Sequence, residues 1–600
     1  MATCLFYNDN DIILLDGDYM KLEWNLEDLF SNNEQFYNEI DKVNELLSEI
    51  NFDIEIINDV DLLDILNREW KIKELANNIL VYGSLMYYKN IKSEECIKLK
   101  NDAEQLSNEV NTQLKKVEIK ILECGKDYIL KLIEKNSDLQ VYGQYIDNIF
   151  RLQDHSQSEK INDIIKNNNN KINEFIGEYN KLLRDIDYGK ININDEIIEV
   201  TSSNFSKYIS SRDRETRKQT YLCVNNSFNY KNDEFASILS NIFEYRIKNA
   251  SLEKYDTVLD KVLSNENIDP CILDSLIKSV NSNLPLIQKY LKLKSDILGI
   301  DSPHLYDFGV PLDNNLKIKY SIEEAIEIIK NALSPLGEEY LKNVDYLLNG
   351  HIDAELDENK HQSITFSWNT YSFMNFRGSY VDLKNMIHEL GHIINYSLSQ
   401  KNLPFIYEDS TIFVGETASI VNEILLNRYL YENAETKEQK LFYLSKEIEN
   451  YFTSVFKQTM YTEFENELYK YRKEFSLTKD VLSQKYFEII KKYYGENIVY
   501  DDEASYEWSR LGHLYRWSYY PYKYATGLII ASVVVDSLID EKTLSKEQYI
   551  KFLESGSCMY SLDLLKMLNI DLTNTDIINE GFSILKKDIN ELEKNFVLKK

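Results

Sequence analysis

Two histidines and a glutamate close together in the chain have the types and spacing of a metal-dependent hydrolytic site. His388 and His392 are four residues apart, and Glu389 directly follows the first of them. On an α-helix, residues four apart lie on the same face, so both imidazoles can bind one metal ion. Glu389 would lie beside that ion and accept a proton from a water molecule there. The alternative is a structural helix that buries two histidines.

The stretch that carries this H-E-x-x-H motif also has the pattern of a helix. Asp382 is the residue that we expect to cap its N-terminus. The extended motif with a third histidine is absent, because Asn395 and Leu398 stand where it has glycine and histidine. The third protein ligand must therefore come from elsewhere. Apolar residues recur at helical spacing along the buried side, at Met386, Ile387, Leu390, Ile393, Ile394 and Leu398.

Several carboxylates downstream of the motif are candidates for the third ligand. Small residues at Gly415, Ala418 and Ser419 would let a helix that carries Glu416 approach the motif helix closely. This argument favours Glu416 only slightly, and the other candidates stay open. The candidates are Glu408, Asp409, Glu416 and Glu423.

The segment 361–376, directly before the motif helix, has the alternation of one or two β-strands. In metallopeptidases, an edge strand at this place can pair with an extended substrate backbone. An ordinary hairpin that covers the helix is an equal alternative.

Composition predicts a large helical protein. Only 18 glycines and 7 prolines occur in 600 residues, which favours long helices over turn-rich β architecture. From about Glu34 to Leu183, apolar residues recur at helical spacing, which predicts a helical lobe over residues 1–200 without chemistry of its own. The pattern of Ile191–Val200 predicts a strand or hairpin near the domain boundary at about residue 200. Residues 201–600 form the predicted catalytic domain. His304 is expected in a loop and not as a ligand.

Charge, cysteine usage and apolar runs limit the possible partners and the cellular compartment. The net charge of −31 makes nucleic acid an unsuitable partner. The 6 cysteines are scattered, as expected for reduced thiols. The first twenty residues lack the basic start of a signal peptide, and the apolar run Leu528–Val535 is too short to span a bilayer. We therefore expect a cytoplasmic protein without a membrane partner, and a monomer, although an oligomer stays open.

The complete set of motifs resembles one family. HELGH is followed by the glutamate of GETAS, 24 residues after His392, and later by H-x-Y and by Y-x-Y before ATG. WNLEDLF near the N-terminus, SSRDRETRK at 210–218, YDTVLD at 255–260 and LGIDSPHLYD at 298–307 extend the likeness over most of the chain. The sequence resembles the oligoendopeptidase F branch of the thimet oligopeptidase family of zinc metallopeptidases.

The resemblance implies a site residue by residue. His388, His392 and Glu416 would bind one Zn²⁺ with water in the open position, and Glu389 would be the general base. The remaining implied residues lie in one late segment: His513 and Tyr522 for the tetrahedral oxyanion, Tyr515 and Tyr519 for substrate binding. The family's Gly-Gly-Tyr loop is replaced here by the sequence HLYRW at 513–517. For Tyr515 and Tyr519, packing against the wall of the channel is therefore an equal alternative.

The resemblance also implies the fold and the substrate. The expected fold is mainly α, a two-lobed helical ellipsoid with a deep central channel and a small β-sheet next to the zinc-motif helix. Its expected activity is endopeptidase cleavage of short, unstructured oligopeptides. A catalytically silent peptide-binding protein on the same scaffold and a purely structural helical protein are the alternatives.

Overall fold

The computed structural model describes residues 21–50, 58–155, 157–312, 316, 318–539 and 543–597. The N-terminal twenty residues, where we predicted no signal peptide, lie outside these ranges, as does Cys4. The described residues are mostly helical, which confirms the predicted fold class.

The helices of the N-terminal 300 residues fall into two sets. The first set is α1 (Asn33–Glu49), α2 (Asp59–Lys89), α3 (Glu94–Cys124), α4 (Lys126–Lys135) and α5 (Gly143–Arg151). The second set is α6 (Glu159–Asp185), α7 (Phe205–Ile209), α8 (Arg214–Tyr230), α9 (Asn232–Leu252), α10 (Val258–Asn265), α11 (Cys271–Ser282) and α12 (Leu284–Leu298).

The remaining helices contain the H-E-x-x-H motif and the late aromatic segment. The motif lies in the group α13 (Ile322–Leu333), α14 (Glu338–Leu348), α15 (Tyr380–Asn402), α16 (Ile412–Glu432), α17 (Lys437–Tyr451), α18 (Lys457–Arg472) and α19 (Lys479–Tyr494). The chain then continues through α20 (Gly512–Arg516), α21 (Pro521–Ile539), α22 (Lys546–Leu553), α23 (Ser561–Lys566) and α24 (Thr575–Leu592).

Two small sheets are present among the described residues. β1 (Lys190–Ile193) and β2 (Glu196–Glu199) form the predicted hairpin, with Ile191 opposite Ile198. The other sheet has the order β3-β5-β4, in which β5 is parallel to β3 and antiparallel to β4. Both β4 and β5 contact α15, which confirms a small sheet beside the motif helix. Its strands are β3 (Ile352–Asp353), β4 (Phe366–Trp368) and β5 (Tyr371–Phe373).

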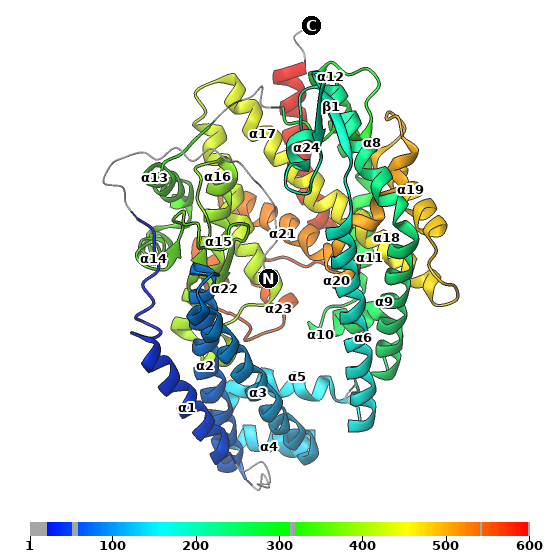
Figure 1. Cartoon of the computed structure of the whole chain (residues 1–600). Helices are drawn as coiled ribbons and strands as arrows, with labels where there is room; N and C mark the ends of the chain where they lie inside the picture. The colour runs from blue at the N-terminus through cyan, green and yellow to red at the C-terminus, as the bar shows by residue number, and fades with distance from the viewer. Residues whose placement is uncertain are drawn as a thin grey trace.

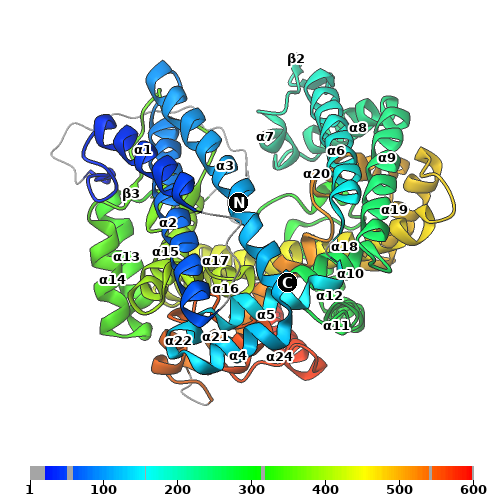
Figure 2. The same cartoon turned by 90° about the horizontal axis from the view of Figure 1, so that it is seen from below.

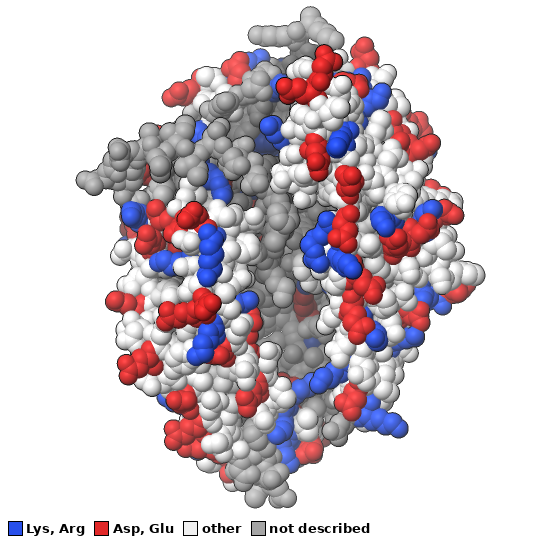
Figure 3. All heavy atoms as spheres, viewed as in Figure 1, with Lys and Arg blue, Asp and Glu red and all other residues white. Residues whose placement is uncertain are grey.

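The helices are arranged in two halves, as Figures 1 and 2 show. α1–α3 and α13–α15 lie in one half, and α6, α8, α9 and α19 lie in the other. α21 contacts α16 on one side and α18 on the other, so it links the two halves. The space-filling view shows the described surface as two flanks with charges of both signs along their facing rims (Figure 3). The depth of a channel between the halves stays a prediction.

The apolar cores show how the chain is divided by packing. α1–α5 build two small cores, and α2 also packs with β5 in a third small core. One large core extends mainly from the second half of α6 to α24. α6 precedes the predicted boundary near residue 200, yet it packs against α9 in the large core. The division into residues 1–200 and 201–600 therefore stays a prediction.

α21 is a core helix with an unusually long apolar stretch. It is the one described helix that is long and apolar enough to cross a membrane, longer than the run Leu528–Val535 considered above. However, 72% of its apolar window is buried inside the protein, as expected for a helix at the centre of a core.

Candidate active site

α15 begins with a capping box one turn earlier than the expected cap. The Ser379 side chain accepts a hydrogen bond from the Asp382 backbone N–H at 3.1 Å, and the Asp382 carboxylate accepts one from the Ser379 N–H at 3.0 Å. Asp382 is therefore the third helical residue, and its predicted role as the cap itself is wrong. Both residue types are good caps, so the two positions could not be distinguished from the sequence. The box sets the start of the helix that carries His388 and His392.

A close contact between α15 and α16 brings Glu416, the predicted third ligand, to the motif. A Cβ on Gly391 would lie 2.5 Å from the Ser419 Cα and 3.0 Å from the Ala418 carbonyl oxygen. The two backbones therefore touch, and only glycine fits at position 391. The small residues of α16 were predicted to allow such an approach. The matching glycine is part of the H-E-x-x-H motif itself, as its fourth residue.

Three side chains converge on one point, namely His388, His392 and Glu416. Their candidate ligand atoms all lie within 4.8 Å of one another. The Nε2 atoms of His388 and His392 are 3.2 Å apart, and His388 Nε2 is 4.0 Å from Glu416 Oε2. Ligands at about 2.1 Å from a tetrahedral zinc ion lie roughly 3.4 Å apart. Two imidazoles and a carboxylate in this arrangement fit zinc with only small side-chain adjustments.

Glu423, one of the open candidates for the third ligand, has a different position. Its Oε1 lies 2.6 Å from His388 Nδ1, and its Oε2 lies 2.9 Å from Lys384 Nζ. Burial disfavours the Glu423 carboxylate, but Lys384 and His388 outweigh burial and lower its pKa to about 2. An ionised carboxylate on Nδ1 leaves Nε2 of His388 as the atom that faces the metal position.

The two histidines differ in their affinity for a proton. Burial disfavours the imidazolium of His388, but the hydrogen bond to Glu423 outweighs it and raises the pKa to about 9. Burial and the neighbouring charge of His388 lower the pKa of His392 to about 4. Metal binding requires a free nitrogen lone pair, so zinc and protons compete for these side chains.

Glu389 lies next to the ligands and is only 8% exposed. Its negative charge favours protonation of both His388 and His392, as expected for a carboxylate beside the pair, although burial and the charge of His388 outweigh it at His392. Burial raises the pKa of Glu416 on the facing helix. The structure therefore brings together the predicted metal ligands and the predicted base.

His513 and Tyr522 both have buried polar atoms without a hydrogen-bond partner in the described part of the chain: Nε2 of His513 and the hydroxyl of Tyr522. Burial lowers the pKa of His513 to about 3, so its imidazole is neutral at neutral pH. The Tyr522 ring lies 6.4 Å from that of Phe413, one turn before Glu416 on α16. Unpaired buried polar atoms are uncommon and call for an explanation.

Tyr515 and Tyr519 lie in the packed wall of the half that contains α6, α8, α9 and α19. The Tyr515 ring stacks on Tyr179 with centroids 3.8 Å apart. The Tyr519 ring stacks on Tyr469 at 5.4 Å, and its hydroxyl donates to the Asn466 side chain at 3.2 Å. Both rings are buried, as the packing alternative requires. Their role in substrate binding stays a prediction.

Two tyrosines that we did not single out lie closer to Glu416. A Cβ on Gly527 would lie 3.9 Å from the Glu416 Cβ, so this face of α21 meets α16. Tyr524 lies one turn before Gly527 on this face of α21, and Tyr520 directly precedes the helix. Burial first, and then the charge of Glu416, raise the pKa of Tyr520. The spacing of Tyr524 and Gly527 along α21 was the available signal.

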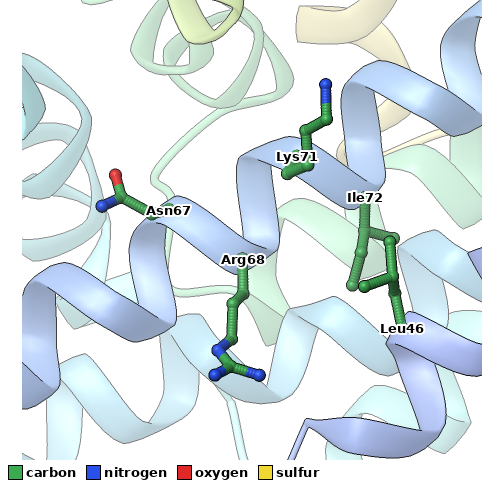
Figure 4. Close-up of a pocket in the computed structure, with 5 residues that line it drawn as sticks. All are labelled: Leu46, Asn67, Arg68, Lys71 and Ile72. Carbon is green, nitrogen blue, oxygen red and sulfur yellow. The ribbon is translucent and has the colours of Figure 1, made fainter.

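A surface pocket elsewhere adds no chemistry to this site. It is lined by Leu46 of α1 and by Asn67, Arg68, Lys71 and Ile72 of α2 (Figure 4). The Arg68 and Lys71 side chains point in different directions in this view, and the lining includes neither a carboxylate nor a predicted site residue.

A helical fold in which an H-E-x-x-H helix meets a glutamate from a second helix defines the class of metal-dependent peptidases. The model of peptidase family M3 matches residues 207–584, and the chain belongs to this family of metallopeptidases. The chain is 29% identical to oligopeptidase PepF of Bacillus subtilis (strain 168), over 97% of this chain and 88% of that protein. It is 27% identical to an oligoendopeptidase F homolog of Borreliella burgdorferi, over 96% of this chain and 98% of that protein.

Solved structures with the same fold cover almost the whole chain. A protein from Chlamydophila abortus matches with a TM-score of 0.87 and 26% identity, over 95% of this chain and 98% of that one. Oligoendopeptidase-F from Enterococcus faecium matches with a TM-score of 0.71 and 24% identity, over 94% of this chain and 99% of that one. The predicted resemblance to oligoendopeptidase F is confirmed by the relatives of that name over nearly the full chain.

Proposed function

We propose that this metallopeptidase is a zinc-dependent endopeptidase that hydrolyses internal bonds of short, unstructured oligopeptides. The observation that carries the proposal is the convergence of His388, His392 and Glu416 within 4.8 Å, beside a buried Glu389. The relatives named oligopeptidase and oligoendopeptidase support the substrate class.

The proposed chemistry divides between the metal and the chain. When bound, zinc would acidify a water molecule and polarise the scissile carbonyl. Glu389 would accept the proton of the attacking water and deliver it to the leaving amine. Glu423 would hold the His388 ring by its Nδ1, with Lys384 keeping the Glu423 carboxylate ionised.

His513 and Tyr522 are the proposed donors to the oxyanion. Each has a buried polar atom that lacks a partner among the described residues, and a developing negative charge on the substrate would satisfy such donors. Because burial keeps His513 neutral, it would act as a hydrogen-bond donor and not as a cation.

The outer edge of β4, which pairs with no other strand among the described residues, is the proposed place for the substrate backbone. β4 pairs with β5 on one side, and all three of its residues are partly exposed. Since β4 also contacts α15, an extended peptide along this strand would pass the metal ligands. The hairpin alternative predicts no such pairing.

We also propose that the protein works in the cytoplasm as a monomer. The cysteines that the structure describes are all free thiols, as a reducing compartment requires.

The test is mass-spectrometric mapping of cuts in a mixed peptide pool, with the wild type and with Glu389→Gln. We expect internal cuts in short peptides, loss of these cuts with a zinc chelator, and recovery after zinc is added back. Glu389→Gln should keep its zinc and lose turnover by several orders of magnitude. A catalytically silent binding protein predicts bound zinc without any cuts, and a structural protein predicts neither. Near-normal turnover by Glu389→Gln would remove this residue from the mechanism.

A further inference from the structure

The loop that joins α20 to α21 separates its aromatic rings onto two sides. The Tyr515 and Tyr519 rings are buried, whereas Trp517 is 44% exposed. The Trp517 and Tyr520 ring centroids are 5.5 Å apart, and those of Tyr520 and Tyr524 are 5.3 Å apart. These three contiguous rings, Trp517, Tyr520 and Tyr524, are called the aromatic strip. α20 lies on the side of its half that faces the other half (Figures 1 and 2).

The backbone of α20 and of this loop is held by two polar side chains, those of Arg246 on α9 and Glu465 on α18. Arg246 donates to the carbonyl oxygens of Leu514 and Tyr515, both at 2.8 Å. Glu465 accepts a hydrogen bond from the Tyr519 backbone N–H at 3.0 Å. A loop fixed in this way presents its exposed rings in one orientation, so a ligand would not have to order them.

Tyr519 explains why the rings alternate between the two sides. Its φ is +51°, in the left-handed region that a bulky side chain rarely adopts. This turn directs the Tyr519 ring into the wall against Tyr469 and leaves Tyr520 free to lie beside Trp517. Backbone strain of this kind is found at ligand-binding segments and persists only where the surroundings enforce it.

The aromatic strip is continuous with the metal cluster. Tyr524 and Gly527 lie one turn apart on one face of α21, and Tyr520 directly precedes this helix. A Cβ added to Gly527 would lie 3.9 Å from the Glu416 Cβ, and the charge of Glu416 acts on both Tyr520 and Tyr524. On the other side, an ion pair between Lys523 and Glu266 borders the Tyr520 ring. The strip is therefore a surface of aromatic rings that runs from beside Glu416 to the exposed Trp517.

We infer that the aromatic strip is a specificity subsite that binds an aromatic or large apolar side chain of the peptide residue next to the scissile bond. This inference rests on the proposed function. Offset and edge-to-face contacts with Trp517 and Tyr520 would favour an aromatic ring over a methyl group. The side chain lies beside the cut because the strip begins at Glu416.

The first experiment compares peptides that differ only in Phe or Ala at each residue flanking the cut. The wild type should prefer Phe at one of the two positions, and Trp517→Ala should reduce this ratio of kcat/KM by about tenfold, mainly through KM. Trp517→Phe should retain most of the preference. Phe475→Ala, which removes another exposed ring (56%), is the matched control and should leave the ratio unchanged. An unchanged ratio in Trp517→Ala would overturn the inference.

The second experiment measures binding without turnover. The affinity of the Phe peptide for zinc-loaded Glu389→Gln is measured by calorimetry, with and without Trp517→Ala. We expect Trp517→Ala to weaken binding of the Phe peptide by about tenfold and to leave the Ala peptide unaffected. Equal affinities would overturn the subsite. If the wild type cuts none of the peptides, the proposed function fails, and the binding result still decides the subsite.

Discussion

Gly391 of α15 lies against Ser419 of α16 with no room for a side chain, since a Cβ at Gly391 would be 2.5 Å from the Ser419 Cα. This contact joins the helix of His388 and His392 to the helix of Glu416. The candidate metal cluster therefore depends on a backbone-to-backbone approach as well as on its three candidate ligands.

Gly391→Ala should both destabilise the protein and weaken zinc binding. The added methyl must push α16 away, at a cost of about 1–3 kcal/mol for overpacking, and Glu416 moves with the helix. Differential scanning calorimetry and a zinc titration check the two effects. Gly177→Ala is the control, because an added Cβ there has nothing within 4 Å and alanine is the better helix former. If Gly391→Ala binds zinc like the wild type, the close approach does not position Glu416.

Glu423→Gln should lower zinc affinity without removing a ligand. The amide retains the shape of the side chain but weakens the charged interactions with His388 Nδ1 and Lys384. We expect about 10–100-fold weaker zinc binding in competition with a chromogenic chelator. Glu74→Gln, which breaks a more exposed ion pair with Lys71, should leave zinc affinity unchanged. Complete loss of zinc from Glu423→Gln would instead indicate that Glu423 is itself a ligand.

Tyr522→Phe should reduce kcat by about 10²–10³ and change KM little, because the hydroxyl is needed only when the oxyanion forms. The melting temperature should stay the same or rise, since a buried hydroxyl without a partner is removed. Tyr549→Phe removes a comparable buried hydroxyl on α22 and should leave kcat unchanged. Normal kcat in Tyr522→Phe would leave His513 as the proposed oxyanion donor.

Glu465→Gln should change how stability depends on pH. Burial raises the pKa of Glu465 to about 8, whereas an unfolded glutamate titrates near 4.3. Between these values the folded protein holds more protons than the unfolded chain, so stability falls as pH rises. Glutamine still accepts from the Tyr519 N–H but cannot ionise.

The Glu465→Gln variant should therefore melt a few degrees above the wild type at pH 8.5 and match it more closely near pH 5. Melting curves at the two pH values test this expectation, since the other titrating groups are common to both proteins. A constant difference between the variant and the wild type would show that Glu465 does not titrate in this range.

The convergence of His388, His392 and Glu416 could be predicted because each of these residues is marked in the sequence. His388 and His392 are marked by their spacing, and the resemblance identified Glu416 among four carboxylates. The position of Glu423 could not be predicted, because a carboxylate that orients a histidine and one that binds the metal occur at similar distances along a helix.

Other features could not be predicted from the sequence because they depend on tertiary contacts. β3 is only two residues long, too short to show any alternation. α6 continues the helical pattern of the first lobe, and only packing against α9 shows which core it joins. The aromatic strip lies in a segment rich in tyrosine, where sequence alone does not distinguish buried rings from exposed ones. The left-handed backbone of Tyr519 makes that distinction.

The most direct test of the central claim is the zinc stoichiometry of Glu416→Ala beside the wild type, measured by elemental analysis after dialysis at a fixed free zinc concentration. The account predicts one zinc per wild-type chain and almost none in Glu416→Ala, with an unchanged helical circular dichroism spectrum. One zinc retained by Glu416→Ala at the same affinity would contradict the proposed site.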